Sequence, residues 1–221
     1  MPSKTTIIIL SLIILSFIAG IYYYQILPEE IASHWNSKGE VDGFMNKTLG
    51  IFLIPILTLI FFLIFILVPQ IDPLRKNIAK FRNHYNTFIL VFMIFMFYVY
   101  LLTLSWNLGY RFNMSLMILP ALTLFFIYIG FLLEKTKRNW FIGIRTPWTL
   151  SSDIVWDKTH KLGGLLFKIS GAIILFGAFF QKYLTWFIVI PIIISTIFLL
   201  IYSYVIYERL KKNPKNKKKN L

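Results

Sequence analysis

The sequence contains no cysteine and few charged residues. Asp, Glu, Lys and Arg together make up 14% of the 221 residues, whereas a soluble domain carries about 25%. Without cysteine there is no disulfide, no thiolate nucleophile and no cysteine ligand for a metal. Hydrophobic residues make up 57% of the chain and the mean hydropathy is +0.70. This composition excludes a soluble globular domain and predicts an integral membrane protein.

The sequence also lacks the short patterns of common enzyme classes. It has no HExxH zinc motif, no GxSxG nucleophile elbow and no glycine-rich phosphate loop. Its three histidines, His34, His84 and His160, are scattered among the loops. We therefore predict that the protein is not an enzyme and binds no cofactor. A membrane enzyme acting on lipid or cell-wall precursors stays an alternative, with Asp153, Asp157 and His160 as its acid–base groups.

Long apolar segments are what the chain has in abundance. A helix needs about 20 apolar residues to cross the hydrocarbon core of a membrane. Six segments qualify: Thr5–Leu27, Leu49–Pro69, Thr87–Ser105, Met114–Leu133, Leu165–Phe180 and Leu184–Tyr207. We expect the first to be a retained helix rather than a signal peptide, because no Ala-x-Ala site follows it. The predicted fold class is an all-α integral membrane protein.

Positive charge predicts which side each loop faces. With a cytoplasmic N-terminus, 18 of the 23 Lys and Arg residues fall inside and four outside, while Lys168 lies within the fifth segment. This bias predicts that both termini are cytoplasmic. The net charge of +14 therefore reflects membrane topology. Direct binding of nucleic acid is not expected, because no aromatic residue lies between the lysines of the basic tail, 208–221.

Two loops are predicted to contain short amphipathic helices at the membrane interface. In the outer loop, Pro28 is followed by two acidic residues, a pattern that is typical of a helix start. The outer apolar stripe at helical spacing consists of Leu27, Ile31 and Trp35. In the first inner loop, Asp72 and Pro73 predict a helix start on anionic lipid. Its stripe consists of Leu74, Ile78, Phe81 and Tyr85.

The outer loop continues with a polar stretch, His34 to Gly43, that contains one histidine and two carboxylates. A metal site is one interpretation, since His and carboxylate suit zinc or harder ions. No second histidine is near, however, and no ligand spacing is recognisable. We favour a solvated turn, whose Asn, Asp and Gly residues fix the backbone, and predict no metal site.

The second inner loop holds the most distinctive segment of the chain, Asn139 to Ser152. It packs three aromatic residues, Gly143, Pro147 and Arg145 into a short stretch between apolar segments. Arg145 among aromatic residues can stack on a ring or bind a carboxylate, with Asp153 and Asp157 as candidate partners in the same loop. The alternative is an ordinary interfacial arginine of the cytoplasmic side.

This segment and the outer loop together resemble the SdpI family of bacterial membrane immunity proteins. The family signature is matched at Asn139, Gly143, Ile144, Arg145, Thr146, Trp148, Thr149, Leu150, Ser151, Trp156, Thr159, His160 and Gly163. The N-terminal half resembles a domain of unknown function that commonly precedes this region. It is matched at Leu27, Pro28, His34, Trp35, Asn36, Gly39, Asp42, Gly43 and Lys47. We accordingly divide the chain into a two-helix unit, 1–86, a four-helix SdpI-like region, 87–207, and the basic tail, 208–221.

The resemblance implies a multi-pass plasma-membrane protein that protects its cell from a secreted killing peptide. It also implies signalling, in which the toxin-bound protein holds a small autorepressor at the membrane. The inner site for that partner would consist of Asn139, Gly143, Arg145, Thr146, Trp148, Ser151, Trp156 and His160. The outer site for the peptide would consist of Pro28, His34, Trp35, Asn36, Gly39 and Asp42. The alternative function is a small transporter or efflux component for amphipathic molecules.

Overall fold

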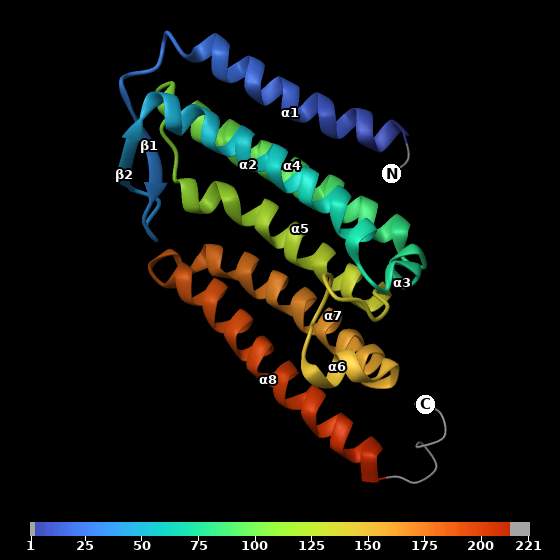
Figure 1. Ribbon diagram of the computed structural model, residues 1–221. Coiled ribbons are helices and arrows are strands. Elements are labelled where there is room, and N and C mark those ends of the chain that lie inside the picture. The colour runs from blue at the N-terminus through green and yellow to red at the C-terminus, as the bar shows by residue number, and fades with distance from the viewer. Residues whose placement is uncertain (1–2, 213–221) are drawn as a thin grey trace.

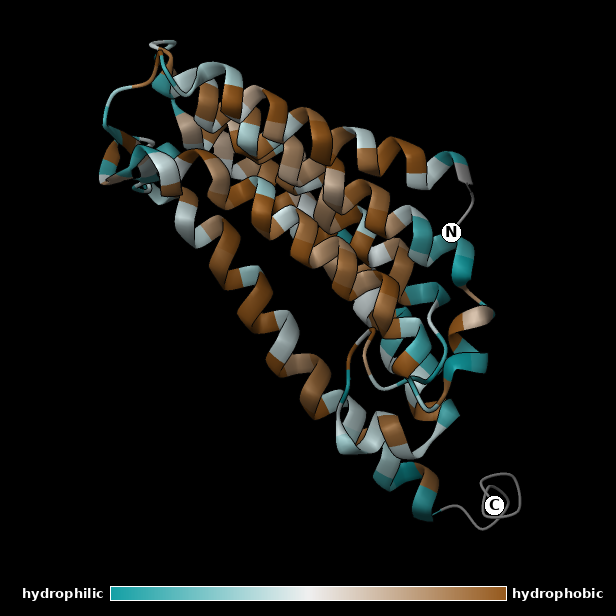
Figure 2. Ribbon diagram, turned by 45° about the horizontal axis from the view of Figure 1, so that its top comes forward, coloured by the Kyte–Doolittle hydropathy of each residue, from teal (hydrophilic) through white to brown (hydrophobic). Residues whose placement is uncertain are grey.

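A computed structural model describes residues 3–212 of the chain, and part of the predicted basic tail, 213–221, lies outside these residues (Figure 1). Six long helices are apolar enough to cross a membrane, which confirms the predicted multi-pass fold. They are α1 (Ser3–Tyr23), α2 (Lys47–Ile71), α4 (Arg82–Asn107), α5 (Met114–Lys135), α7 (Asp153–Phe176) and α8 (Leu184–Lys212). Figure 2 shows that hydrophobic residues predominate along these helices and that hydrophilic residues gather near their ends, as expected of helices in contact with lipid.

Shorter elements connect the long helices. They are the strands β1 (Glu30–Trp35) and β2 (Val41–Asn46), the helices α3 (Arg75–Ala79) and α6 (Pro147–Ser151), and the 3-10 turns η1 (Gly177–Phe179) and η2 (Gln181–Tyr183). The strands, the α4–α5 connection and the 3-10 turns lie at one end of the bundle, here called the hairpin end (Figure 1). Helices α3 and α6 lie at the opposite end, together with the start of α1 and the end of α8.

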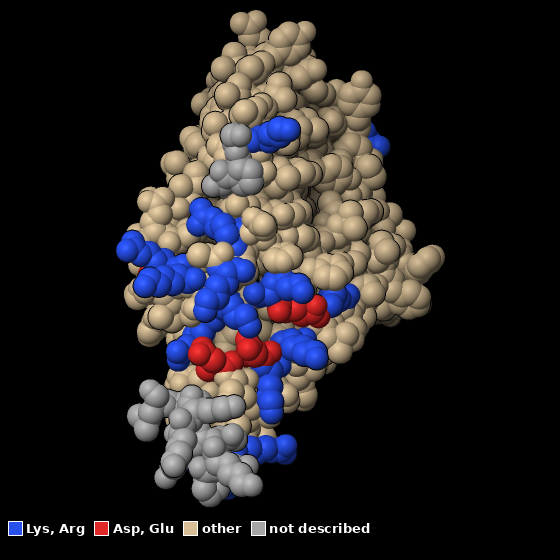
Figure 3. Space-filling model, turned by 90° about the vertical axis from the view of Figure 1, so that its right-hand side faces the viewer, with Lys and Arg blue, Asp and Glu red and all other residues tan. Residues whose placement is uncertain are grey.

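This opposite end gathers most of the positive charge and is here called the basic end (Figure 3). Its Lys and Arg residues, among those described, are Lys4, Arg75, Lys76, Lys80, Arg82, Lys135, Lys137, Arg138, Arg145, Lys158, Lys161, Arg209, Lys211 and Lys212. The segregation of charge predicted from the sequence is thus a feature of the three-dimensional structure.

The prediction of an amphipathic helix in the outer loop is wrong, because the segment forms an antiparallel β-hairpin. Strand β1 pairs with β2 over Glu30↔Asn46 to Trp35↔Val41, with irregular register near His34. Buried residues are consecutive in β1, where Ile31 and Ala32 are 2% and 1% exposed. A single helical stripe does not account for two adjacent buried positions. Pairing with β2 satisfies the backbone instead.

The predicted inner amphipathic helix is real but short, and its stripe does not face lipid. Helix α3 ends at Ala79, and α4 begins two residues after Lys80, at Arg82. Ile78, Phe81 and Tyr85 are buried with residues of α1, α2 and α5 in one apolar cluster. The stripe therefore closes the protein core at the basic end.

The fifth membrane helix is longer than the sequence predicted. Helix α7 begins at Asp153 rather than Leu165, because Ser152 caps its first turn by accepting a hydrogen bond from the Val155 N–H. Trp156 and His160 therefore lie on the first turns of a membrane helix, which gives them a rigid support.

Glycines let α5 and α7 pack closely. A Cβ on Gly164 would overlap the Gly130 carbonyl oxygen, and a Cβ on Gly171 would crowd the Thr123 carbonyl oxygen. Small residues at these positions let the two helix backbones approach closely, as is common between membrane helices. Beside this crossing, Lys168 Nζ lies 2.6 Å from Glu134 Oε1, so the charge predicted inside the membrane helix is paired across the two helices.

Candidate functional site

The segment 136–152 forms a compact loop at the basic end, and hydrogen bonds of Asn139 hold its conformation. The Asn139 side chain accepts hydrogen bonds from the N–H groups of Phe141 and Ile142 at 2.9 and 2.6 Å. It also donates to the carbonyls of Lys137 and Ile142 at 2.8 and 2.9 Å. Asn139 is 0% exposed, so water cannot replace these bonds, and the loop conformation depends on this one amide.

The loop is tied to the first inner connection by Asp72. One carboxylate oxygen of this buried residue accepts from the Leu74 N–H at 2.6 Å, and the other accepts from the Trp140 N–H at 2.9 Å. Asn77 adds a second tie by donating to the Arg138 carbonyl at 2.9 Å. The sequence identified Asp72 only as a helix start. Nothing in the sequence indicated its second partner, which lies 68 residues away.

His160 joins the loop to α7. Its Nε2 accepts from the Ile144 N–H at 2.8 Å, so its Nδ1 carries the proton that is donated to the Trp156 carbonyl at 2.9 Å. The imidazole stacks on the Trp156 ring with centroids 3.9 Å apart. Gly143 has φ +116°, and a Cβ there would overlap His160 Nε2. His160 is thus a buried acceptor for the loop backbone, and Gly143 makes room for it.

Thr146 starts helix α6 and connects it to α8. Its hydroxyl accepts from the Thr149 N–H at 3.1 Å, and Thr149 Oγ1 accepts from the Thr146 N–H at 2.8 Å, a reciprocal cap. The Thr146 hydroxyl also lies 3.1 Å from the Ser203 hydroxyl of α8. Trp148 packs on Tyr204 of the same helix, with ring centroids 5.1 Å apart. Exposed Ser151 donates to the Trp148 carbonyl.

Arg145 does not pair with either carboxylate that the sequence suggested, so that expectation was wrong. Asp153 lies 2.8 Å from Arg138 Nε, and Asp157 lies 3.1 Å from Lys137 Nζ. Arg145 instead donates to the Trp140 carbonyl at 2.7 Å and is exposed. The prediction failed because both carboxylates pair with other basic residues, Arg138 and Lys137, that are also close to α7. Its guanidinium keeps donors free for another molecule.

Arg145 stands beside an apolar cavity. The cavity has a volume of about 490 Å³ and lies between α2, α4, α5 and α7, under residues 141–145. Its walls include Phe65, Tyr85 and Phe167, and Arg145 is the one charged side chain among the described residues that line it. This combination suits a molecule with an apolar body and an anionic head.

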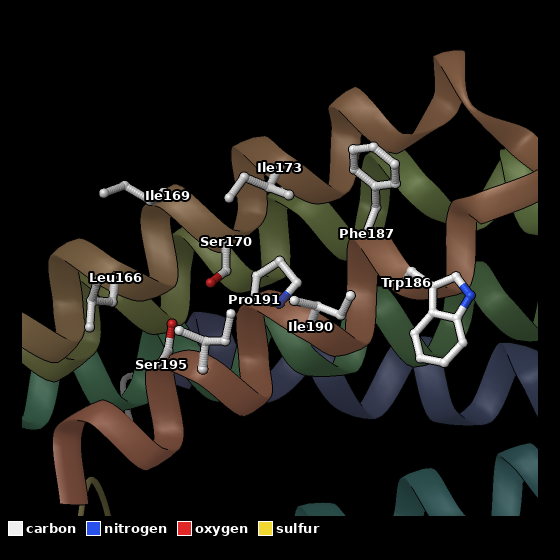
Figure 4. Close-up of a pocket in the computed structure, with 10 residues that line it drawn as sticks. Leu166, Ile169, Ser170, Ile173, Trp186, Phe187, Ile190, Pro191 and Ser195 are labelled. Atoms are coloured by element: carbon white, nitrogen blue, oxygen red, sulfur yellow. The ribbon is translucent and has the colours of Figure 1, made fainter. Parts of the chain in front are cut away.

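A second apolar groove of about 430 Å³ lies between α7 and α8 (Figure 4). Its walls are apolar apart from Ser170 of α7 and Ser195 of α8, and Pro191 of α8 also lines it. No titratable side chain lines it among the described residues. We interpret it as a packing surface for lipid chains rather than a chemical site.

At the hairpin end, Asn36 organises the turn between the strands. Its side-chain oxygen accepts from the N–H groups of Lys38 and Glu40 at 2.8 and 3.1 Å. Gly39 has φ +79°, which favours glycine. Asn113 holds the turn from the α4–α5 connection by donating to the Lys38 carbonyl at 2.8 Å.

The remaining predicted outer residues divide into packed and exposed groups. Trp35 packs edge-on against Trp106 of α4, with ring centroids 5.7 Å apart. His34 Nδ1 and Asp42 Oδ1 form a hydrogen bond on the exposed face of the hairpin, with side chains 72% and 44% exposed. Pro28 is exposed just before β1. Asn107, which the sequence did not single out, holds β1 from α4 by bonding both the N–H and the carbonyl of Ala32.

The three groups of the alternative acid–base set do not converge. Asp153 and Asp157 are engaged with Arg138 and Lys137, whereas His160 is 1% exposed and has both ring nitrogens bonded to backbone. The structure therefore brings together the loop residues of the predicted inner site as one folded unit.

Comparison with known proteins agrees with this architecture. Residues 135–203, which hold the loop, α7 and most of α8, match the SdpI/YfhL protein family. Residues 11–59 match a domain of unknown function, DUF1648. The chain is 30% identical over 208 residues to the immunity protein SdpI of Bacillus subtilis (strain 168), covering 94% of this chain and 98% of that protein. The chain belongs to the SdpI family.

Membership of the SdpI family supports an immunity function and a multi-pass location in the plasma membrane. The two matched regions contain the β-hairpin, which lies within 11–59, and the organised loop, which lies within 135–203. No solved structure matches the chain.

Proposed function

We propose that this SdpI-family protein protects its cell from a secreted peptide toxin, with the hairpin end facing outward. The observation that carries the proposal is the pairing of two structured ends with opposite properties on one bundle. The hairpin end presents exposed polar side chains, and the basic end presents a rigid loop with exposed Arg145, Trp140 and Phe141. Positive charge gathers at the basic end (Figure 3), which favours the cytoplasmic side for it.

In this proposal the basic end binds a cytoplasmic partner, for which a small autorepressor is the candidate. Most predicted inner residues are committed to the loop itself: Asn139, Thr146 and His160 bond backbone or other side chains in the interior. Arg145 is exposed and spends one donor on the loop. A partner would therefore contact Arg145 and the neighbouring rings, while the buried residues shape the surface. In this proposal, some residues assigned to the partner site contact the partner, and the others shape the surface that it contacts.

The test compares survival of a sensitive Gram-positive host that expresses the wild-type chain, Arg145→Ala or Arg145→Lys, under challenge with an SdpC-type peptide toxin. Wild type is expected to rescue growth. Arg145→Ala is expected to lose protection at an unchanged membrane level, since the change removes a single exposed hydrogen bond of the loop, to the Trp140 carbonyl. Arg145→Lys keeps the charge without the planar fork and is expected to protect weakly. Equal rescue by all three would show that Arg145 is not part of the function.

A second function, transport of amphipathic molecules, is favoured by the cavity beside Arg145. About 490 Å³ of apolar volume under one arginine matches an anionic amphiphile better than a folded partner. Proteoliposomes with the purified protein would be loaded with a fluorescent fatty acid. Flux above that of protein-free vesicles, abolished by Arg145→Ala, would establish transport. Flux equal to protein-free vesicles would end this alternative.

A further inference from the structure

The β-hairpin has one closed edge and one open edge. Antiparallel strands alternate between hydrogen-bonded residue pairs and pairs whose N–H and carbonyl groups point away from each other. The Lys47 N–H donates to the Glu29 carbonyl at 2.8 Å across the start of the ladder. Stepping along the register, Ile31↔Met45 is then hydrogen-bonded and Ala32↔Phe44 is not.

Asn107 confirms this assignment and closes the edge of β1. Its side chain accepts from the Ala32 N–H at 2.8 Å and donates to the Ala32 carbonyl at 3.0 Å, as a neighbouring strand would. Both Ala32 groups therefore point away from β2. By the same geometry the N–H and carbonyl of Phe44 point away from β1, toward the other side of the hairpin.

The edge of β2 has no counterpart of Asn107 among the described residues. No hydrogen bond from another element reaches Phe44, whose side chain is 62% exposed. Figure 1 shows β2 on the outer side of the hairpin, with β1 toward the helices. An exposed strand edge with free backbone groups and an apolar side chain beside it accepts an extended peptide as an additional strand.

The charge around the hairpin indicates what such a peptide carries. Four of the nine acidic residues of the chain lie in or beside the hairpin: Glu29, Glu30, Glu40 and Asp42. Lys47, the first residue of α2, pairs with Glu29 at 2.8 Å, and Lys38 lies in the turn between the strands. The hairpin is thus the acidic part of an otherwise basic protein, and it complements a positive charge.

We propose that the outer edge of β2 binds an extended segment of the secreted peptide by strand addition at Phe44, next to a positively charged group of the peptide. This inference rests on the proposed immunity function and adds the mode of recognition. The backbone of Phe44 supplies hydrogen bonds, its ring supplies an apolar contact, and the acidic residues of the hairpin select charge. Asn107 restricts the added strand to one edge of the hairpin.

The decisive variant is Phe44→Pro, with Phe44→Val as the matched control. Proline removes the outward N–H of residue 44 and none of the ladder bonds, and proline is tolerated at such edge positions. Valine shortens the side chain but keeps the N–H. Survival under challenge and binding of the SdpC-type peptide to the full-length protein in nanodiscs would be measured for both. We expect Phe44→Pro to lose binding and protection and Phe44→Val to keep most of each.

Two further measurements keep the outcome decisive. If Phe44→Pro does not reach the membrane, a photoreactive phenylalanine analogue at position 44 replaces it. The inference then predicts cross-linking to the peptide, with none from the same analogue at Phe141 at the basic end. Acetylation of the peptide amines is expected to weaken binding, and unchanged binding would overturn the charge assignment.

The results separate the two proposals. If wild type protects and binds, but Phe44→Pro performs as well as Phe44→Val or the analogue at position 44 forms no cross-link, strand addition is wrong while the immunity function stands. If wild type neither protects nor binds, both proposals are wrong.

Discussion

Asn36 at the hairpin end and Asn139 at the basic end organise their turns in the same way but in different surroundings. Each side chain accepts hydrogen bonds from two backbone N–H groups a few residues ahead. Asn36 is half-buried, and its amide nitrogen donates to the exposed Glu40 carboxylate at 3.1 Å. Asn139 is fully buried, and its amide nitrogen donates to two loop carbonyls.

The difference indicates how each end works. At the basic end the buried polar side chains form hydrogen bonds within the loop. A partner would therefore contact only the residues that the loop exposes. At the hairpin end water can replace several of the internal bonds, and the strand edge at Phe44 stays open. In our proposals, the loop at the basic end is a fixed surface, whereas the hairpin end offers the exposed backbone groups of Phe44 for recognition.

The largest effect is expected for Asn139→Ala. This change leaves several buried backbone groups without partners, each costing about 1–3 kcal/mol, so we expect a loss on the order of 3 kcal/mol or more. Asn36→Ala is the matched control and should cost about 1 kcal/mol, because water reaches the turn. Thermal unfolding of both variants in one detergent would measure the difference. Equal losses would show that the two turns are equally buried in solution.

A smaller effect is expected for Gly143→Ala, with Gly109→Ala as control. Both glycines have positive φ, +116° and +103°, so alanine is strained at each by about 1–2 kcal/mol. At Gly109 a Cβ meets no atom within 4 Å, whereas at Gly143 it overlaps His160 Nε2. Gly143→Ala should therefore lower the melting temperature further than Gly109→Ala. A matched pair of melting temperatures would mean that His160 moves aside without cost.

The sequence predicted the membrane helices well, because hydropathy over a whole span needs no knowledge of neighbours. It missed the hairpin, because Leu27, Ile31 and Trp35 fit helical spacing while the pairing partner of β1 lies beyond the turn. Strand pairing is a non-local property that a single apolar stripe does not reveal. The fifth membrane span was predicted too short, because the polar first turns of α7, which Ser152 caps, lower the hydropathy on which the span prediction rests.

For the site, the sequence identified the residues but not what each one does. Asn139, Gly143 and Thr146 do lie in one loop, and His160 of α7 contacts that loop. Their roles are to shape it, which composition and spacing cannot distinguish from contacting a partner. The carboxylates predicted to pair with Arg145 were wrong, because proximity along the chain does not fix the direction of a side chain. The hydrogen bond between Asp72 and the Trp140 N–H was not predicted, because Trp140 is in another loop.

The smallest effect is expected for His34→Ala at the hairpin end. The contact between His34 and Asp42 is largely exposed, and exposed polar pairs, even charged ones, contribute about 0–1 kcal/mol. The hairpin is held mainly by Asn107 on Ala32 and by Trp35 against Trp106, so it should stay folded without His34. The melting temperature of His34→Ala should therefore stay close to wild type and well above that of Gly143→Ala. If His34→Ala instead destabilised the protein as much as Gly143→Ala, the hairpin would depend on its exposed side chains for its own fold. Its exposed face would then be no freer for a ligand than the loop at the basic end.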